Sequence, residues 1–82
     1  MSTEVLKELL AYLAEGLVDE PDDVAVEEFE EDDGTLVLEL SVAADDYGKV
    51  IGRGGRTAQA LRTVIKAAAV NCDRRVLVDI VD

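Results

Sequence analysis

The sequence predicts an α+β fold in which a three-stranded sheet packs against helices in one domain, residues 1–82. Helical and strand-like segments follow one another in the order α-β-β-α-α-β. A chain of 82 residues has room for one hydrophobic core but not for two. Hydrophobic residues make up 49% of the chain and aromatic residues only 4%, so we expect an aliphatic core.

The first helix is expected to begin after Ser2 or Thr3, because both residue types are good N-caps. Apolar side chains then recur at three-to-four-residue spacing and form one face: Val5, Leu6, Leu9, Leu10, Leu13, Leu17 and Val18. Pro21 cannot continue a helix, so the acidic segment 19–23 is the predicted exit loop.

Three strands are expected, over residues 24–31, 35–42 and 76–81. The first two are joined by a turn at Asp32-Asp33-Gly34. The second alternates most clearly, with one apolar face: Leu36, Leu38, Leu40 and Val42. In the first strand Val26 is out of phase with Phe29; a bulge or an edge position would explain this, and the pattern does not choose between them.

Two helices are expected between the second and third strands. A short helix, capped by Asp45 or Asp46, ends at Gly52, and a longer one runs from Gly55 or Arg56 to about residue 71. The longer helix has an apolar stripe: Ala58, Leu61, Val64, Ile65, Ala68 and Ala69. It also has a polar stripe: Gln59, Arg62 and Lys66.

Charge is distributed unevenly along the chain. The net charge is −11, but residues 1–46 carry −15, whereas residues 47–77 carry +6. The second segment contains almost all the basic residues: Lys49, Arg53, Arg56, Arg62, Lys66, Arg74 and Arg75. A polyanionic partner is therefore compatible with one part of the surface despite the acidic total.

The glycine-rich loop Gly52-Arg53-Gly54-Gly55 between the two helices is the motif that carries chemistry. Glycines there cost conformational entropy and add no packing, so such a loop suits close approach of the backbone to a ligand. The following helix directs its free N–H groups and its positive dipole end at the loop, an arrangement that favours phosphate. Lys49, Arg53 and Arg56 should form one contiguous positive patch at this point.

Other phosphate loops and enzymatic sites do not fit. Gly48-Lys49 is followed by Val50, so the P-loop ending is missing, and Thr57 stands where the dinucleotide fingerprint needs a glycine. The chain has no histidine and one cysteine, and the acidic run 27–33 lacks the ligand spacing of a calcium loop. We therefore expect no catalysis, no metal and no cofactor.

The loop and its flanks resemble a known family. Val50-Ile51-Gly52-Arg53-Gly54-Gly55 is similar to the Val-Ile-Gly-x-x-Gly signature of KH domains, whose GXXG loop, here residues 52–55, clamps the backbone of about four nucleotides. The order α-β-β-α-α-β resembles the type II KH form. Over its whole length the chain resembles the small bacterial stand-alone KH proteins of the KhpA family.

This resemblance implies a non-catalytic, cytoplasmic protein that binds single-stranded RNA, as an RNA chaperone or post-transcriptional regulator. It also implies a homodimer and a larger KH-containing partner of the KhpB type. With no long apolar stretch in the sequence, no membrane partner is expected. The residues expected to contact RNA are Lys49, Ile51, Gly52, Arg53, Gly54, Gly55, Arg56 and Arg62. Bases should lie over an aliphatic groove formed by the two helices and the 35–42 strand.

Several alternatives stay open at this stage. The fold could serve mainly for protein interaction or dimerisation, with close approach through an alanine-rich helix face: Ala60, Ala67 and Ala68. Arg62 and Lys66 could simply form the solvated face of a helix, and the pair 74–75 reads more readily as surface charge than as RNA contacts. Of Val50 and Ile51, one should face the core and one the groove.

Overall fold

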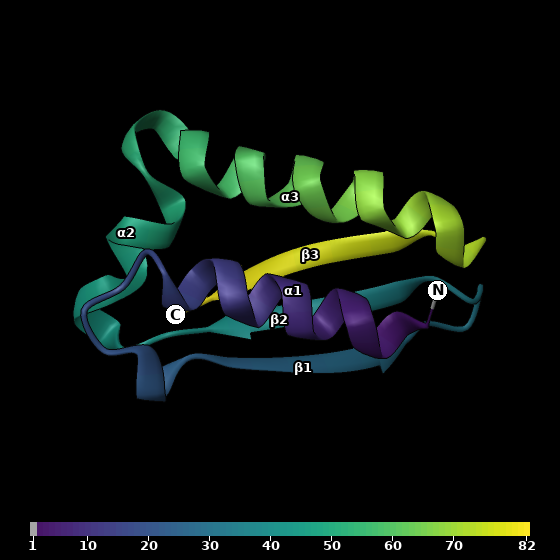
Figure 1. Cartoon of the computed structure of the whole chain (residues 1–82), viewed down its shortest axis with the longest axis horizontal. Coiled ribbons are helices and arrows are strands. Elements are labelled where there is room, and N and C mark those ends of the chain that lie inside the picture. The colour runs from purple at the N-terminus through teal and green to yellow at the C-terminus, as the bar shows by residue number, and fades with distance from the viewer. Residues whose placement is uncertain (1) are drawn as a thin grey trace.

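The computed structural model describes residues 2–82 and has the predicted α+β architecture (Figure 1). In these residues the helices are α1 (Thr3–Glu15), α2 (Tyr47–Ile51) and α3 (Arg56–Ala69). The strands are β1 (Ala25–Glu30), β2 (Leu36–Ser41) and β3 (Val76–Val81). Short 3₁₀ turns occupy Pro21–Asp23, Ala44–Asp46, Arg53–Gly55 and Val70–Cys72. The element order predicted from the sequence is confirmed.

The sheet has the strand order β1-β2-β3, with β1 antiparallel and β3 parallel to β2. The register of β1 with β2 runs unbroken over six pairs, from Ala25 opposite Ser41 to Glu30 opposite Leu36. An edge position, and not a bulge, therefore explains the irregular pattern of β1: Val26 is buried, while Phe29 lies on the opposite face and is 48% exposed.

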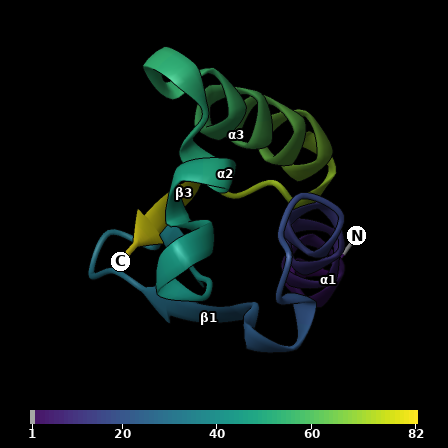
Figure 2. The ribbon, with the colours of Figure 1, turned by 90° about the vertical axis from the view of Figure 1, so that its left-hand side faces the viewer.

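Helices α1 and α3 lie on the same side of the sheet, and the end-on view shows the other face open (Figure 2). The core between helices and sheet is aliphatic, as predicted, and its largest fully buried apolar side chains are Leu6, Leu10, Leu38, Leu40, Ile65 and Val50. Alternation in β2 buries the side chains at positions 36, 38 and 40, which gives the sheet its inner face.

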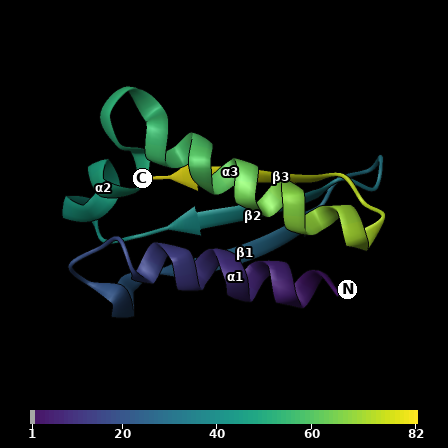
Figure 3. The ribbon, with the colours of Figure 1, turned by 45° about the horizontal axis from the view of Figure 1, so that its top comes forward.

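The strand beside α3 is the last one of the chain. The predicted 35–42 strand, β2, is central and is paired on both edges. Strands β1 and β3 form the two edges of the sheet, and β3 packs along α3 (Figure 3). Sequence periodicity could not reveal this, because it gives the face of a residue but not the order of the strands.

Helix α3 ends two residues before the predicted position. After Ala69 the chain tightens into the 3₁₀ turn Val70–Cys72, and Asp73 then adopts a left-handed conformation with φ of 53°. That conformation stops the helix and redirects the chain into β3, whose bounds match the predicted 76–81. The chain end after β3 lies at the same end of the sheet as α2 (Figures 1 and 3). Among the described residues, no helix combines the length and the apolar character needed to cross a membrane.

Candidate nucleic-acid interface

Helix α2 anchors the glycine loop to the core. Val50 is fully buried, whereas Ile51 is half-buried and only packs against the core from its edge. The Gly52 N–H donates to the Gly48 carbonyl at 2.9 Å, which closes the helix before the loop. The loop that follows is thus held by a packed side chain on one side and by α3 on the other.

The three glycines of the loop all have positive φ, but for different reasons. Gly52 has φ 76° and ψ 170°, a region that is essentially restricted to glycine. A Cβ there would overlap Thr57 Oγ1 and lie 2.8 Å from the Thr57 backbone nitrogen. Gly54 (φ 65°) and Gly55 (φ 80°) have open space where a Cβ would be. Gly52 is therefore required by local packing, whereas Gly54 and Gly55 leave room for another molecule.

The N-terminus of α3 is open to an anion. Its N-cap is Gly55, which has no side chain to satisfy the first N–H groups, and the first turn contains no acidic residue. Arg53 and Arg56 are both exposed beside it. Neither makes an ion pair within residues 2–82. The Arg56 N–H already donates to the Arg53 carbonyl. This helix start therefore offers an anion its later first-turn N–H groups, the positive dipole end and two exposed arginines.

Lys49 differs from these two arginines because it is already paired. Its Nζ lies 3.2 Å from Asp19 Oδ2 and 3.2 Å from Asp46 Oδ1, and these hydrogen bonds, the Asp19 one foremost, raise the pKa of the Lys49 ammonium. The unpaired positive charges nearest the loop are therefore Arg53 and Arg56, and Lys49 instead ties α2 to the acidic exit loop of α1.

Asp46 was expected only as a possible cap of α2; it stands at the N-cap position but makes no side-chain cap hydrogen bond, and its partners lie elsewhere. It is 1% exposed, and its Oδ2 accepts the Glu20 backbone N–H at 3.0 Å while Oδ1 faces Lys49. Burial by itself would raise the pKa of Asp46, but hydrogen bonds from the backbone of Glu20 and Asp19 and from Lys49 outweigh it and lower that pKa. Nothing in the local pattern distinguished this aspartate from its exposed neighbour Asp45.

Arg62 lies where α3 faces β3, one of the two edge strands of the sheet. Its Nε donates to the carbonyl of Val78 on β3 at 3.3 Å, and the side chain is half-buried. Lys66, one helical turn further on the same stripe, is exposed. The polar stripe predicted on this helix therefore includes a residue that contacts β3 directly.

Arg74 is a structural residue. Its Nη2 lies 2.8 Å from Glu30 Oε1 and donates to the Gly34 carbonyl at 3.0 Å, so it fastens the β1–β2 turn to the start of β3. Arg75 is exposed and makes no ion pair with any residue in the range 2–82. The adjacent arginines thus have different environments.

A second, apolar surface lies on the other side of α3. The groove between α1 and α3 measures about 220 Å³ and is lined by Leu13, Leu17, Thr57, Ala60, Leu61 and Val64. Leu17 is 40% exposed and Val64 is 43% exposed. Of the alanines predicted to allow close approach, Ala60 lines this groove.

Comparison with known proteins identifies the family. The family model described as KhpA/KhpB, KH domain, matches residues 7–80. The chain is 56% identical over 78 residues to RNA-binding protein KhpA of Halalkalibacterium halodurans, covering 94% of this chain and all of that protein. It is 44% identical over 82 residues to RNA-binding protein KhpA of Bacillus subtilis, with both chains fully covered. With RNA-binding protein KhpA of Streptomyces coelicolor it shares 53% identity over 78 residues, 95% of this chain and 94% of that one.

Solved structures support the fold. Era in complex with MgGDPNP and nucleotides 1506–1542 of 16S ribosomal RNA aligns over 92% of this chain and 28% of its own, with a TM-score of 0.61 and 21% identity. Era of Aquifex aeolicus, bound to GDP and AlF4⁻, aligns with the same TM-score and identity over 93% of this chain and 29% of its own. The present chain thus corresponds to less than a third of Era.

Proposed function

Since the chain belongs to the KhpA/KhpB family of KH domains, we propose that it binds single-stranded RNA without catalysing a reaction and grips the backbone at Gly52–Gly55. In this proposal it acts in the bacterial cytoplasm as an RNA chaperone or post-transcriptional regulator. The observation that carries the proposal is the open N-terminus of α3, where the glycine loop meets Arg53 and Arg56.

The backbone of the RNA lies against Gly54 and Gly55, where nothing occupies the space of a side chain. Its phosphates accept N–H groups of the first turn of α3 beyond that of Arg56, which donates to the Arg53 carbonyl, and are neutralised by Arg53 and Arg56. Lys49 contributes indirectly, because its ion pairs with Asp19 and Asp46 fix the helix that leads into the loop.

The bases lie along the cleft between α3 and β3. Ile51 offers its half-exposed side chain at the loop end, and Arg62 lines the cleft further along. The free edge of β3 supplies unpaired backbone groups that can bond to bases. Since the part of the cleft built by α2 and the loop contains no aromatic side chain beyond the half-buried Tyr47, stacking contributes little and sequence preference is low.

Fluorescence anisotropy with a labelled RNA oligonucleotide of about four nucleotides, the length that a KH loop clamps, tests this proposal. Contacts to two or three phosphates predict that log K falls against log salt with a slope of about −1.4 to −2.1. The same strand as a fully paired duplex should bind much more weakly, because the loop and cleft accept one strand. A folded protein that binds neither form would refute the proposal.

We further propose that the chain self-associates through the apolar groove between α1 and α3. Leu17 and Val64 are large, exposed apolar side chains that line this groove. Ala60, which also lines it, has a small side chain and so allows a second chain to approach closely. This groove lies on the α1 side of α3, whereas Arg62 lies on the β3 side. A homodimer, or a complex with a larger KhpB-type partner on the same surface, therefore leaves the proposed RNA cleft accessible.

Sedimentation velocity tests self-association. The parent should sediment as a dimer at high micromolar concentration, and Val64→Glu should sediment as the 8.8 kDa monomer, because a carboxylate would be buried in the apolar contact. Gln59→Glu adds the same charge on the exposed polar stripe and should leave the dimer intact. A monomeric parent would remove this part of the proposal without affecting RNA binding.

A further inference from the structure

A cavity lies between the C-terminal end of α3 and the start of β3, at the opposite end of α3 from the glycine loop. It measures about 550 Å³ and is lined by Lys66, Ala69, Val70, Asp73, Arg74, Arg75 and Val76. Its apolar base is formed by Ala69 and Val76, which are 5% and 4% exposed, so the backbone around it is fixed by the core. The other lining residues include three cations and one carboxylate.

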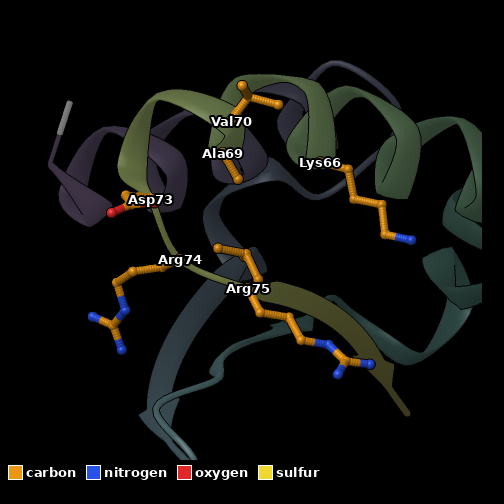
Figure 4. Close-up of a pocket in the computed structure, with 7 residues that line it drawn as sticks. Lys66, Ala69, Val70, Asp73, Arg74 and Arg75 are labelled. Atoms are coloured by element: carbon orange, nitrogen blue, oxygen red, sulfur yellow. The ribbon is translucent and has the colours of Figure 1, made fainter.

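The two free cations of this cavity point the same way. Lys66, from α3, and Arg75, from the segment before β3, extend to one side, whereas Arg74 and Asp73 extend to the other (Figure 4). Within the described chain Lys66 and Arg75 form no ion pair, while Arg74 is held by Glu30. The Asp73 carboxylate is therefore not positioned between the two free cations.

Arg75 also lies near the turn between β1 and β2. The pKa of Asp33 is lowered mainly by the backbone N–H of Thr35, and the charge of Arg75 contributes less. Asp33 accepts the Thr35 N–H at 2.9 Å, and among the described residues no carboxylate, Asp33 included, lies within ion-pair distance of the Arg75 guanidinium.

The cavity stands in line with the proposed RNA cleft. Gly55 and Lys66 are separated by eleven residues of helix, or roughly 16 Å at 1.5 Å per residue. A stacked strand advances about 3.4 Å per nucleotide, so this distance corresponds to about five nucleotides, and to fewer if the strand is extended. Arg62 lies between the two ends, on the side of α3 that carries Lys66.

We infer that Lys66 and Arg75 form a second phosphate-binding site, which holds the backbone of single-stranded RNA where it leaves the cleft opposite the glycine loop. This inference rests on the proposed function, since it extends the same bound strand. The protein then holds the RNA at two points. An RNA that is longer than the segment clamped by the loop gains affinity from the second point.

Two labelled RNA oligonucleotides, of about four and about ten nucleotides, test the inference against salt. With the longer RNA, Lys66→Gln and Arg75→Gln should each weaken binding about fourfold at 0.15 M salt and reduce the salt slope by about 0.7. Binding of the shorter RNA should not change by more than it does in the charge-matched control Lys7→Gln, on α1. Lys66→Arg should bind both RNAs like the parent.

Amide chemical shifts give an independent readout. Titration with the longer RNA should shift the Ala69 and Val76 amides, and titration with the shorter RNA should shift the loop and the adjoining cleft but not these two amides. If both Gln variants match Lys7→Gln on the longer RNA, the second site is refuted while the loop proposal stands. If the folded parent binds neither RNA, the proposed function fails and the second site fails with it.

Discussion

Like charges lie close together in two regions of the molecule. One is the glycine loop with α3, and the other is the face of the sheet that no helix covers. On the basic side, Arg53 in the loop and Arg56 at the start of α3 are exposed beside a helix N-terminus that has no side-chain cap. On the acidic side, Glu27, Glu39 and Asp79 stand in register across all three strands, which places three carboxylates in one row. No cation pairs with this row in the part of the chain that the structure describes.

The separation of these two regions explains why an overall charge of −11 is compatible with RNA binding. The acidic row lies on the face of the sheet that no helix covers, whereas α3 lies on the opposite face (Figure 2). The side chains of the row point to the face of the strands opposite the core, so they do not face a strand bound in the proposed cleft. The charges nearest to such a strand belong to the segment 47–77, which carries +6.

Reversing the charge at the loop should produce the largest effect. Arg53→Asp combined with Gly54→Asp should reduce RNA affinity by at least 100-fold, because two carboxylates would then face a phosphate at a helix N-terminus. Both positions are exposed, and aspartate tolerates the left-handed conformation of Gly54 at a cost of about 1 kcal/mol, so circular dichroism should change little. Anisotropy measures the affinity.

The control for that variant is Lys7→Asp, which adds negative charge on α1, away from the loop. It should change RNA affinity by less than about threefold, in keeping with screening beyond a Debye length. Equal losses in the two proteins would show that total charge governs binding and would break the comparison between the two regions.

Within the loop, the glycines should differ in their effect on stability. Gly52→Ala should lower the free energy of unfolding by about 2–4 kcal/mol, because the new Cβ combines an unfavourable φ with overlap against Thr57. Gly54→Ala meets no atom within 4 Å and should cost only the left-handed conformation, about 1–2 kcal/mol. Urea unfolding measures both. Equal costs would mean that Thr57 moves aside and that Gly52 is not required by packing.

Asp46 should make the loop region sensitive to acid. The native pKa of Asp46 is lowered below 3.8, so its contribution to stability is present above its unfolded-state pKa and is lost as pH falls through the lower native pKa. Asp46→Asn should therefore lower the Tm at pH 7, and the difference from the parent should shrink in strong acid. Asp45→Asn, at the exposed neighbouring position, should show no such dependence.

The sequence predicted those features of this comparison that depend on local periodicity. The alternation of β2 and the bounds of β3 are confirmed because a period of two and flanking turn residues are local signals. The polar stripe predicted on α3 also has a structural counterpart, since its Arg62 donates to the Val78 carbonyl on β3.

Features that depend on distant residues could not be predicted. Asp46 is bonded to Glu20, 26 residues away, and nothing short of the folded chain brings these two together. The pairing of Lys49 with Asp19 is hidden in the same way, since the first half of the sequence offers sixteen acids as partners. The contact that makes Gly52 obligatory depends on the angle between α2 and α3. The contacts of Asp46, Lys49 and Gly52 all depend on how separate elements pack against one another.

The smallest expected effect concerns the carboxylate row. Glu39 is the central member, directly opposite Glu27 on one side and Asp79 on the other, and like charges in such cross-strand pairs are destabilising. Glu39→Thr replaces it with a good strand former and should raise the free energy of unfolding by about 0.5 kcal/mol. For a domain of this size that corresponds to a rise in Tm of about 2–4 °C.

Glu28→Thr is the matched control, because Glu28 has the same charge and is also in a strand but lies opposite Leu38. The gain in the free energy of unfolding of Glu28→Thr should come only from the better strand propensity of threonine and should not depend on salt. The additional gain of Glu39→Thr should disappear at about 1 M salt, where the Debye length falls to about 3 Å. Thermal unfolding at low and high salt measures both. If the two variants gain the same stability at low salt, the three carboxylates of the row do not repel one another. The acidic face would then cost the fold no stability.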